Sequence, residues 1–532
     1  MSPLNGGQRT EAVETTAWTP GAACPRFAEV TALVLFGATG DLTRRKLMPA
    51  IYSLMADGLL PCGLPILSVG RRVAAREQLL EEFHEAAATR SRRKPLDEAL
   101  WAAMAEGIHY VRGELDDSAT YAAVKEKLEQ LDSQAPAPMN RLFYLAVPPH
   151  FFRPVIDNLS ASGLSGQSFG RHGWPRIVVE KPFGSDLESA RELNRQLQML
   201  FSEKQIYRMD HYLGKETVQN LLVLRFANAI FEPLWNHRYI SNVQITISET
   251  VGLEGRGQYF DRSGMLRDVV QNHMFELLAL TAMEPPVSMD ADAVRDEKTK
   301  VLRSLRPLTE ADVAQRTVRA RYDAGEVEGQ QVPAYLQEPG VAPESQTETY
   351  AALRLEVDNW RWAGVPFLLR AGKRLKSRAT EIVVRFRPAP HLVFEGQERS
   401  IEPNALVLRI QPNEGVSLCF AAKEPGPGLH IQPVPLEFHF ADAFKIEPPD
   451  AYERLILDSL LGDGTLFARA DSIEQSWSLM MPILEAWQAG ASPLATYPAG
   501  SWGPPEAKAL IEPTGDQWQE PGRCLWAAEP ES

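Results

Sequence analysis

The chain has 532 residues, more than one hydrophobic core usually organises, so we expect two domains rather than a single small module. Apolar residues make up 44% and charged residues 23% of the chain, which excludes a collagen-like, coiled-coil or wholly disordered protein. The formal net charge of −14 disfavours nucleic acid and anionic membranes as partners, so an anionic ligand requires a local cluster of positive charge.

Cysteine spacing and hydropathy give expectations about the compartment. Cys24, Cys62, Cys419 and Cys524 form no CxxC pair and have no histidine at metal-ligand spacing, so we expect neither a disulfide framework nor a metal site. Uninterrupted apolar stretches stay short of eighteen residues, and the first thirty residues lack the pattern of a secretory signal. We therefore predict a cytoplasmic protein that does not insert into a membrane.

The first part of the chain alternates strand and helix patterns. Residues 1–28 have no apolar period and are predicted to form a flexible arm. A continuous apolar run at 30–37 predicts a buried strand, followed by a glycine turn and a helix in which Pro49 must lie early or which it must bend. The same alternation continues through a helix at 77–88 and strands at 65–70, 108–111, 141–147 and 176–180. This pattern predicts a doubly wound, Rossmann-like parallel sheet, and we assign residues 29–210 to that domain.

The pattern changes from about Asn242. NVQITISETVG alternates as an antiparallel strand would, and a helical stretch follows from Gly264 to Thr281. Further strands are predicted in the segments YAALRLEV, TEIVVRFRP, NALVLRIQP, GVSLCFAA and VPLEFHF. We therefore predict a large C-terminal β+α domain, residues 211–532, built on a mainly antiparallel sheet. The Pro- and Gly-rich stretch 337–348 is predicted to be a surface loop.

A glycine-containing turn, GATGDL at Gly37 to Leu42, lies between the first strand and its helix. Such a turn lets the backbone approach a pyrophosphate at a helix N-terminus, although its spacing is GxxG rather than GxGxxG and close strand-to-helix packing alone also produces it. Arg71 and Arg72 end the second strand, where an acidic residue would accept from a ribose 2′-hydroxyl. Guanidinium groups attract a 2′-phosphate instead, so NADP is favoured over NAD unless these are ordinary solvated arginines.

Three later segments concentrate side chains suited to chemistry. In EKPFG, Lys181 ends a strand and faces the edge where ligands bind in such sheets, although a strand-ending turn is the alternative. In RMDHYLGKE, His211, Tyr212 and Lys215 can donate to a phosphate or carboxylate, with a charged surface turn as the alternative.

The helix GMLRDVVQNHMFELLAL supplies His273, the residue type best suited to remove a proton from an alcohol near neutral pH. A lone histidine beside apolar residues is more often a core residue, so this assignment depends on the other motifs. Five residues of a regular α-helix turn by about 500°, which would leave Asp268 and His273 on different faces. The two can reach one ligand only across the helix flank or on an irregular helix.

With GATGDL, EKPFG, RMDHYLGKE, EGRGQYFD, RDVVQNH and RAGK in this order, the chain resembles the glucose-6-phosphate dehydrogenase family over roughly residues 30–500. The resemblance implies oxidation of glucose 6-phosphate to the 6-phospho-1,5-lactone with NADP, the first step of the pentose phosphate pathway. It also implies a homodimer or homotetramer assembled through the large sheet.

The resemblance further implies roles for individual residues. Asp210 and His273 match the catalytic dyad. Coenzyme contacts are implied for Gly37, Thr39, Gly40, Arg71, Pro148 and Lys181. Sugar or phosphate contacts are implied for Lys46, Lys181, His211, Tyr212, Lys215, Glu249, Asp268 and Lys373. Two alternatives stay open at this point: a non-catalytic NADP-binding or assembly homologue, and an oxidoreductase that acts on an unphosphorylated sugar.

Overall fold

The structure, a computed structural model, describes residues 30–72, 75–137, 139–165, 173–394, 401–445 and 447–521. The predicted arm at 1–28, Cys24 and Cys524 lie outside these residues. Contacts divide the chain into two compact units. Unit 1 contains the chain up to Glu180, Leu197–Tyr207 and Tyr452–Asp463, and unit 2 contains Lys181–Gln196, Arg208–Ala451 and the chain from Gly464 onward. The units are therefore interleaved in sequence, whereas the predicted domains were continuous ranges.

Unit 1 is built on a six-stranded sheet with the order β3-β2-β1-β4-β5-β6, and β1 to β5 pair in parallel. The strands are β1 (Thr31–Phe36), β2 (Ile66–Gly70), β3 (Ile108–Arg112), β4 (Asn140–Leu145), β5 (Pro175–Val179) and β6 (Ile206–Arg208). Both β1 and β4 are buried along their whole length, as strands covered on both faces require. The predicted doubly wound parallel sheet is confirmed.

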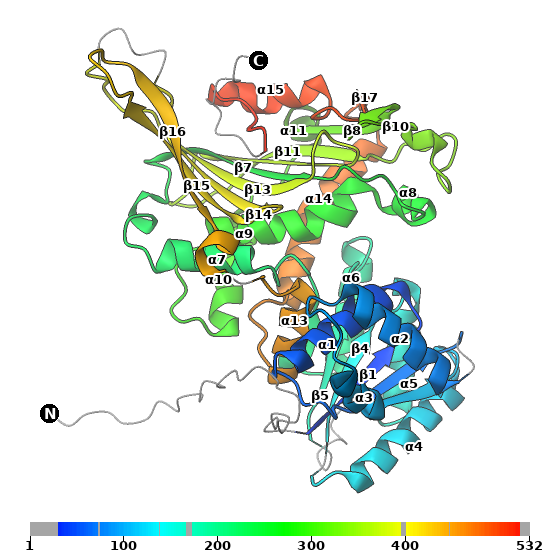
Figure 1. Cartoon of the computed structure of the whole chain (residues 1–532). Helices are drawn as coiled ribbons and strands as arrows, with labels where there is room; N and C mark the ends of the chain where they lie inside the picture. Colours follow the sequence, from blue (N-terminus) through cyan, green and yellow to red (C-terminus); the bar gives the residue numbers. More distant parts are fainter. Residues whose placement is uncertain are drawn as a thin grey trace, which may run out of the picture. The chain divides into compact units, whose positions relative to one another are not determined.

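Helices surround this sheet (Figure 1). They are η1 (Thr43–Leu47), α1 (Met48–Ala56), α2 (Arg76–Arg90), α3 (Glu98–Gly107), α4 (Ser118–Gln134) and α5 (Phe152–Ala161). The turn after β1 leads into η1, which has π-helical geometry, and α1 follows directly. Pro49 lies near the start of α1 but inside a continuous helical stretch, so its missing N–H falls close to the junction between the π-helical and α-helical segments.

Unit 2 is built on a nine-stranded sheet with the order β16-β15-β14-β13-β7-β12-β11-β8-β17. Its strands are β7 (Ile240–Ser248), β8 (Thr317–Asp323), β11 (Tyr350–Glu356), β12 (Pro366–Gly372), β13 (Ala379–Phe386), β14 (Ala405–Gln411), β15 (Gly415–Lys423), β16 (Ile431–His439) and β17 (Leu494–Pro498). Most neighbours are antiparallel, as predicted, but β12 pairs with β7 and β17 pairs with β8 in parallel. β9 (Gly325–Val327) and β10 (Gln330–Val332) form a separate small hairpin.

The helices of unit 2 include α6 (Leu187–Leu200, part of which belongs to unit 1), α7 (Glu216–Phe226), α8 (Gly257–Met265), η6 (Leu266–Met274), α9 (Phe275–Ala282), α10 (Ala291–Ser304), α11 (Glu310–Arg316), α14 (Ala470–Gln488) and α15 (Lys508–Ile511). All of α13 (Ala451–Leu461) except Ala451 belongs to unit 1. In Figure 1, α9 and α14 lie on one side of the nine-stranded sheet and α15 lies on the other. The predicted helix at 264–281 therefore exists, but it consists of η6 followed by α9.

The C-terminal segment 502–520 covers polar residues in the middle of this sheet. Asp516 accepts from the side chains of Asn242 (2.5 Å) and Arg385 (2.8 Å). The backbone of Gln519 donates to Gln244 (2.8 Å) and accepts from Arg370. The expected alternation of β7 is present, because Asn242 and Gln244 share one face, but this polar face is buried too.

The described residues bear on two expectations, that the chain has no disulfide framework and that it does not insert into a membrane. Cys62 and Cys419 each take part in a disulfide, so the expectation of a chain without disulfides is wrong. The spacing of cysteines along the chain does not reveal which of them meet in the fold. Within the described ranges, no helix combines the length and apolar character needed to cross a bilayer.

A buried ion-pair network holds α13 in unit 1. The Arg92 guanidinium lies 2.5 Å from Asp57 and 2.7 Å from Glu453, whose side chain is only 2% exposed. We expect Arg92→Met to lower the free energy of unfolding by about 3 kcal/mol, because it leaves a carboxylate buried without its cation. The neighbouring Arg93 also pairs with Asp57 but is half exposed, so Arg93→Met should cost less than about 1 kcal/mol. Urea unfolding followed by circular dichroism would measure both, and equal losses would contradict the prediction.

Candidate active site

Close packing of the backbone requires the two glycines of the turn in unit 1. Gly37 has a φ of +86°, and a Cβ atom placed on it would lie 2.2 Å from the carbonyl oxygen of Ala146. A Cβ on Gly40 would lie 2.9 Å from the carbonyl oxygen of Gly37. The Gly37 and Ala38 amides both donate to the Val69 carbonyl at the end of β2, which fixes the turn at the carboxyl ends of the strands. The turn therefore lies directly before a helix, at the edge of the sheet where dinucleotides bind in folds of this kind.

The two arginines after β2 point to different partners, as expected for neighbours on extended backbone. Arg71 forms an exposed ion pair with Glu114 at 3.3 Å. Arg72 donates to the backbone oxygen of Thr39 in the glycine turn at 2.6 Å. Lys46 and Pro148 also belong to unit 1, and their predicted contacts with sugar or nicotinamide stay predictions.

The proposed dyad lies within unit 2 and is buried. Nδ1 of His273 lies 2.5 Å from Oδ1 of Asp210, and the two residues are 2% and 5% exposed. Nε2 of His273 lies 3.0 Å from the ammonium of Lys181. Because an ammonium can only donate, Nε2 is the acceptor, so Nδ1 carries the proton and donates to Asp210. This is the tautomer that a general base acting through Nε2 requires.

The helix that carries His273 is irregular, which solves the geometric problem raised by its sequence. Residues 266–274 form a π-helix, in which hydrogen bonds join residues five apart. Asp268 and His273 are separated by five residues and both face Lys181. The Lys181 ammonium donates to the backbone oxygen of Asp268 (3.2 Å) and to its carboxylate (3.4 Å) as well as to His273. The π-helical geometry therefore brings three of the predicted residues together.

The electrostatics keep the His273 imidazole neutral and the Asp268 carboxylate charged. Burial, reinforced by the Lys181 ammonium, holds the pKa of His273 well below its usual value. Burial would raise the pKa of Asp268, but the ammonium groups of Lys181 and Lys373 outweigh it and hold that pKa at about 2. Burial also raises the pKa of Asp210, against the opposing effect of His211, the Tyr212 amide, Lys181 and Lys298. A neutral imidazole at neutral pH can accept a proton.

The RMDHYLGKE segment surrounds the histidine with further donors. The Tyr212 ring stacks on His273 with centroids 4.3 Å apart, and the His211 ring meets it edge-on at 4.8 Å. The Lys215 ammonium lies 5.1 Å from the centre of the Tyr212 ring and donates to Gln411. His211, Tyr212 and Lys215 are thus brought to one place beside the dyad.

The remaining predicted sugar contacts come from the large sheet. Lys373, directly after β12, is 3% exposed and donates to the Glu249 carboxylate, directly after β7. These strands are parallel neighbours, so the two residues that follow them end at the same edge. The effect of Lys373 on the pKa of Asp268 shows that this pair belongs to the same charge cluster.

Asp210, His211 and His273 bring their ligand-type atoms within 4.8 Å of one another, as a metal centre also would. Both nitrogens of His273 already face other partners, one a carboxylate and one an ammonium. The positive charge of Lys181 beside Nε2 disfavours a metal cation at this nitrogen, so the arrangement suits proton transfer better than metal binding.

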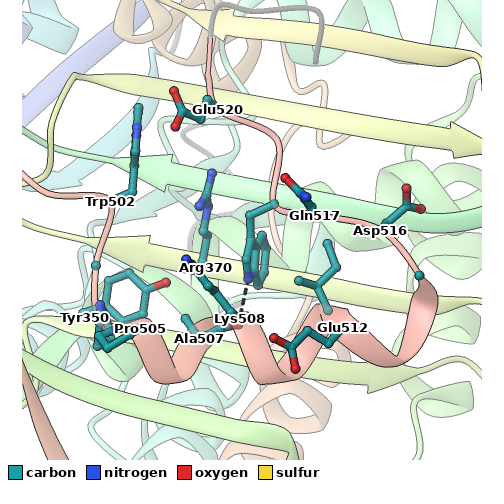
Figure 2. A pocket seen from close by; sticks show the side chains of 15 residues that line it. Tyr350, Arg370, Trp502, Pro505, Ala507, Lys508, Glu512, Asp516, Gln517 and Glu520 are labelled. Atoms are coloured by element: carbon teal, nitrogen blue, oxygen red, sulfur yellow. Dashed lines mark hydrogen bonds between the residues drawn. The ribbon is translucent and has the colours of Figure 1, made fainter. Parts of the chain in front are cut away.

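A cavity of about 690 Å³ lies elsewhere in unit 2, between the sheet and the C-terminal segment (Figure 2). The buried Arg370 guanidinium lies 4.8 Å from the Trp518 ring and 5.5 Å from the Trp502 ring. The residues that line the cavity include none of the predicted site residues. Its walls are distinct from the dyad and its surrounding donors.

Sequence reasoning missed residues that orient the predicted ones. Tyr259 donates to the Asp268 carboxylate at 3.1 Å, and Gln411 accepts from Lys215. Both lie in segments already singled out, EGRGQYFD and NALVLRIQP, but their partners could not be read from spacing. Glu348 lies at the end of the predicted surface loop, yet it is 6% exposed and accepts from the amide of Leu266 at the start of η6.

A doubly wound unit with a glycine turn after its first strand, in one chain with a unit that holds a buried histidine–aspartate pair, is typical of a pyridine-nucleotide-dependent dehydrogenase. Family models agree with this class. "Glucose-6-phosphate dehydrogenase, NAD binding domain" matches residues 34–220, and "Glucose-6-phosphate dehydrogenase, C-terminal domain" matches residues 222–519. The chain belongs to the glucose-6-phosphate dehydrogenase family, and the match extends beyond the predicted limit near residue 500.

Individual relatives agree with the family over nearly the whole chain. Glucose-6-phosphate 1-dehydrogenase of Treponema pallidum (strain Nichols) is 46% identical over 93% of this chain and 96% of its own length. A solved glucose-6-phosphate dehydrogenase in complex with its substrate glucose-6-phosphate is 37% identical, with a TM-score of 0.84 over 93% of this chain and all of that chain. The enzyme from Mycobacterium avium is 39% identical, with a TM-score of 0.77 over 92% of this chain and 99% of that chain. These findings favour an enzyme over the non-catalytic alternative.

Gly264, two residues before the start of η6, tests how the π-helix is supported. Its φ of +69° and ψ of 177° are open to almost no residue but glycine, and a Cβ there would lie 2.4 Å from Glu348. We expect Gly264→Ala to destabilise the protein by about 1–3 kcal/mol and to lower kcat, because η6 must shift. Gly255→Ala is the matched control, since Gly255 also has positive φ but has nothing within 4 Å of its Cβ position. Thermal unfolding and kcat measured together would contradict the prediction if the two variants behaved alike.

Proposed function

We propose that the chain oxidises glucose 6-phosphate to the 6-phospho-1,5-lactone with NADP as the hydride acceptor. The observation that carries the proposal is the buried His273–Asp210 pair, with the His211 and Tyr212 rings against His273 and the Lys215 ammonium near the Tyr212 ring. A base and an anion-binding cluster are the two requirements for oxidising a phosphorylated sugar. Membership of the family supports the same reaction.

His273 acts as the general base. Its Nε2 accepts the proton of the anomeric hydroxyl while the carbon–oxygen bond gains double-bond character and the same carbon loses a hydride. The nicotinamide coenzyme, when bound, supplies the acceptor for that hydride. Asp210 holds the reactive tautomer through the Nδ1 proton and stabilises the imidazolium that forms. In this proposal the anomeric hydroxyl takes the position that Lys181 holds against Nε2, and Lys181 moves its hydrogen bond to the sugar.

The phosphate of the substrate is proposed to bind His211, Tyr212 and Lys215. The His211 ring lies against His273, and the Lys215 ammonium near Tyr212 carries the positive charge that the phosphate needs. Glu249, Asp268 and Lys373 are proposed to bind sugar hydroxyls. Binding energy from the phosphate, which does not react, would hold the sugar in its reactive orientation.

A pyridine nucleotide as coenzyme follows from the family and the glycine turn. We propose NADP in particular, because the turn is followed at the end of β2 by Arg71 and Arg72 and not by an acidic residue. Gly37, Thr39 and Gly40 would hold the pyrophosphate, Arg71 the 2′-phosphate, and Pro148 and Lys181 the nicotinamide end. Cytoplasmic residence stays a prediction, and so does a homodimer or homotetramer. Assembly through the large sheet is supported by exposed apolar residues on β15 and β16, namely Phe420, Leu436 and Phe438.

Replacing His273 tests the base. We expect His273→Asn to lower kcat about 10²–10⁴-fold with glucose 6-phosphate, because general-base assistance is lost. Absorbance of the reduced coenzyme measures the rate, with the exposed His430→Asn as a control that should keep normal activity. A near-normal kcat for His273→Asn would remove this residue as the base.

Comparing sugars tests the phosphate site in the same assay. Lys215→Met should lower kcat/KM for glucose 6-phosphate about ten- to a hundredfold, because a charge-assisted hydrogen bond is lost, and should change the rate with glucose little. If wild-type activity with free glucose matched that with the phosphorylated sugar, the proposed phosphate site would be wrong. Absence of turnover with either sugar and either coenzyme would favour a binding protein.

Single substitutions of the two arginines test the coenzyme preference. We expect Arg71→Ala to raise the KM for NADP about tenfold or more and to change the KM for NAD little, because only NADP carries the 2′-phosphate. Arg72→Ala is the comparison, since Arg72 donates to the turn and not to Glu114. Initial rates with each coenzyme give both constants. A loss seen with Arg72→Ala alone would transfer the phosphate contact to Arg72.

A further inference from the structure

A second buried ion pair joins α9, the helix that continues from η6, to α10, and the mechanism above does not use it. The Lys298 ammonium on α10 lies 2.5 Å from the Glu276 carboxylate on α9. Their side chains are 2% and 9% exposed. Burial of an ammonium and a carboxylate costs free energy that a single ion pair rarely recovers, so such a pair calls for a role beyond stability.

The position of this pair connects it to the dyad. Glu276 follows His273 by three residues on the helix that continues from η6 into α9, and α10 packs against α9. Oδ2 of Asp210 is buried and has no hydrogen-bond partner among the described residues. The pKa of Asp210 responds to Lys298, and the pKa of Glu276 responds to Asp210. The two ion pairs are therefore within electrostatic reach of one another.

The other charges around Asp210 come from several elements. His211 and the Tyr212 amide belong to its own segment, and Lys181 follows β5. His273 faces Asp210 from η6, Glu276 from α9 and Lys298 from α10. Asp268 and Lys215 act on His273. Lys181 is proposed to move to the substrate during turnover, whereas Lys298 is held in place by Glu276.

We propose that Lys298 and Glu276 are positioning residues that set the proton affinity of the His273–Asp210 dyad. This inference rests on the proposed function of that dyad. The Lys298 cation favours the ionised form of Asp210 and opposes protonation of the dyad, while Glu276 fixes Lys298 and offsets part of its charge. Neither residue touches the substrate or the coenzyme in this account.

The two substitutions should move the pH profile in opposite directions. Lys298→Met removes a cation, so the dyad binds a proton more readily and the acid limb of kcat/KM should move to higher pH by about half a unit or more. Glu276→Gln removes an anion, so the same limb should move to lower pH. Lys298→Arg keeps the charge and should restore a profile close to that of the wild type.

The experiment is a pH profile of kcat/KM with glucose 6-phosphate and NADP on the full-length chain. Lys300→Met is the matched control, because Lys300 lies on the same helix, is exposed and pairs with Glu297. Its profile should match that of the wild type. A purely structural role would lower the rate at every pH, so an unmoved acid limb in both Lys298→Met and Glu276→Gln, or a shift of both in one direction, would overturn the proposal.

A variant that fails to fold does not end the test. The double variant Lys298→Met/Glu276→Gln removes both charges, which a protein interior tolerates better than one unpaired charge. The acid limb of its kcat/KM profile should lie at a pH between those of the two single variants. An acid limb at the same pH as that of Lys298→Met would contradict the proposal. A wild-type chain without turnover would refute the proposed function itself, a result distinct from an unshifted profile.

Discussion

The short contact between the His273 imidazole and the Asp210 carboxylate is the interaction on which the rest of the site depends. A carboxylate that is 5% exposed stays ionised only when cations and hydrogen-bond donors replace the lost water. The chain supplies them from separate segments: Lys181 after β5, the Tyr212 amide, and Lys298 on α10. Each segment must reach its position before the histidine has a charged partner, so the chemistry is a property of the folded unit and not of any one motif.

Much of the fold could be predicted because hydrophobic patterning is local. The apolar runs of β1 and β4 appear in the sequence as buried strands, and they are buried along their whole length. The geometry of η6 was not predictable in the same way. An α-helix and a π-helix have the same apolar pattern over a few residues, and here the Gly264 conformation and the Glu348 contact at the helix start come from a distant loop.

The candidate site also contains some residues that could be predicted from the sequence and others that could not. Asp210, His211 and His273 were recognisable because they lie in dense motifs of residue types suited to proton transfer and anion binding. Lys298 and Glu276 were not, because charged residues on an amphipathic helix are usually solvated and nothing in the sequence marks these two as buried. Their burial follows from the packing of α10 on α9, a tertiary contact that the local pattern of either helix does not contain. Cys62 and Cys419 illustrate the same limit for disulfides.

The arrangement of the last described residues has a consequence for how the chain is made. Asn242, Gln244 and Arg385 lie in the middle of the nine-stranded sheet, but their hydrogen-bond partners Asp516, Gln517 and Gln519 are more than a hundred residues further along the chain. During synthesis, strands β7 and β13 therefore leave the ribosome long before these side chains can be satisfied. Truncation before residue 516 would leave buried amide and guanidinium groups open to water, so a premature stop even close to the end would affect the centre of the sheet.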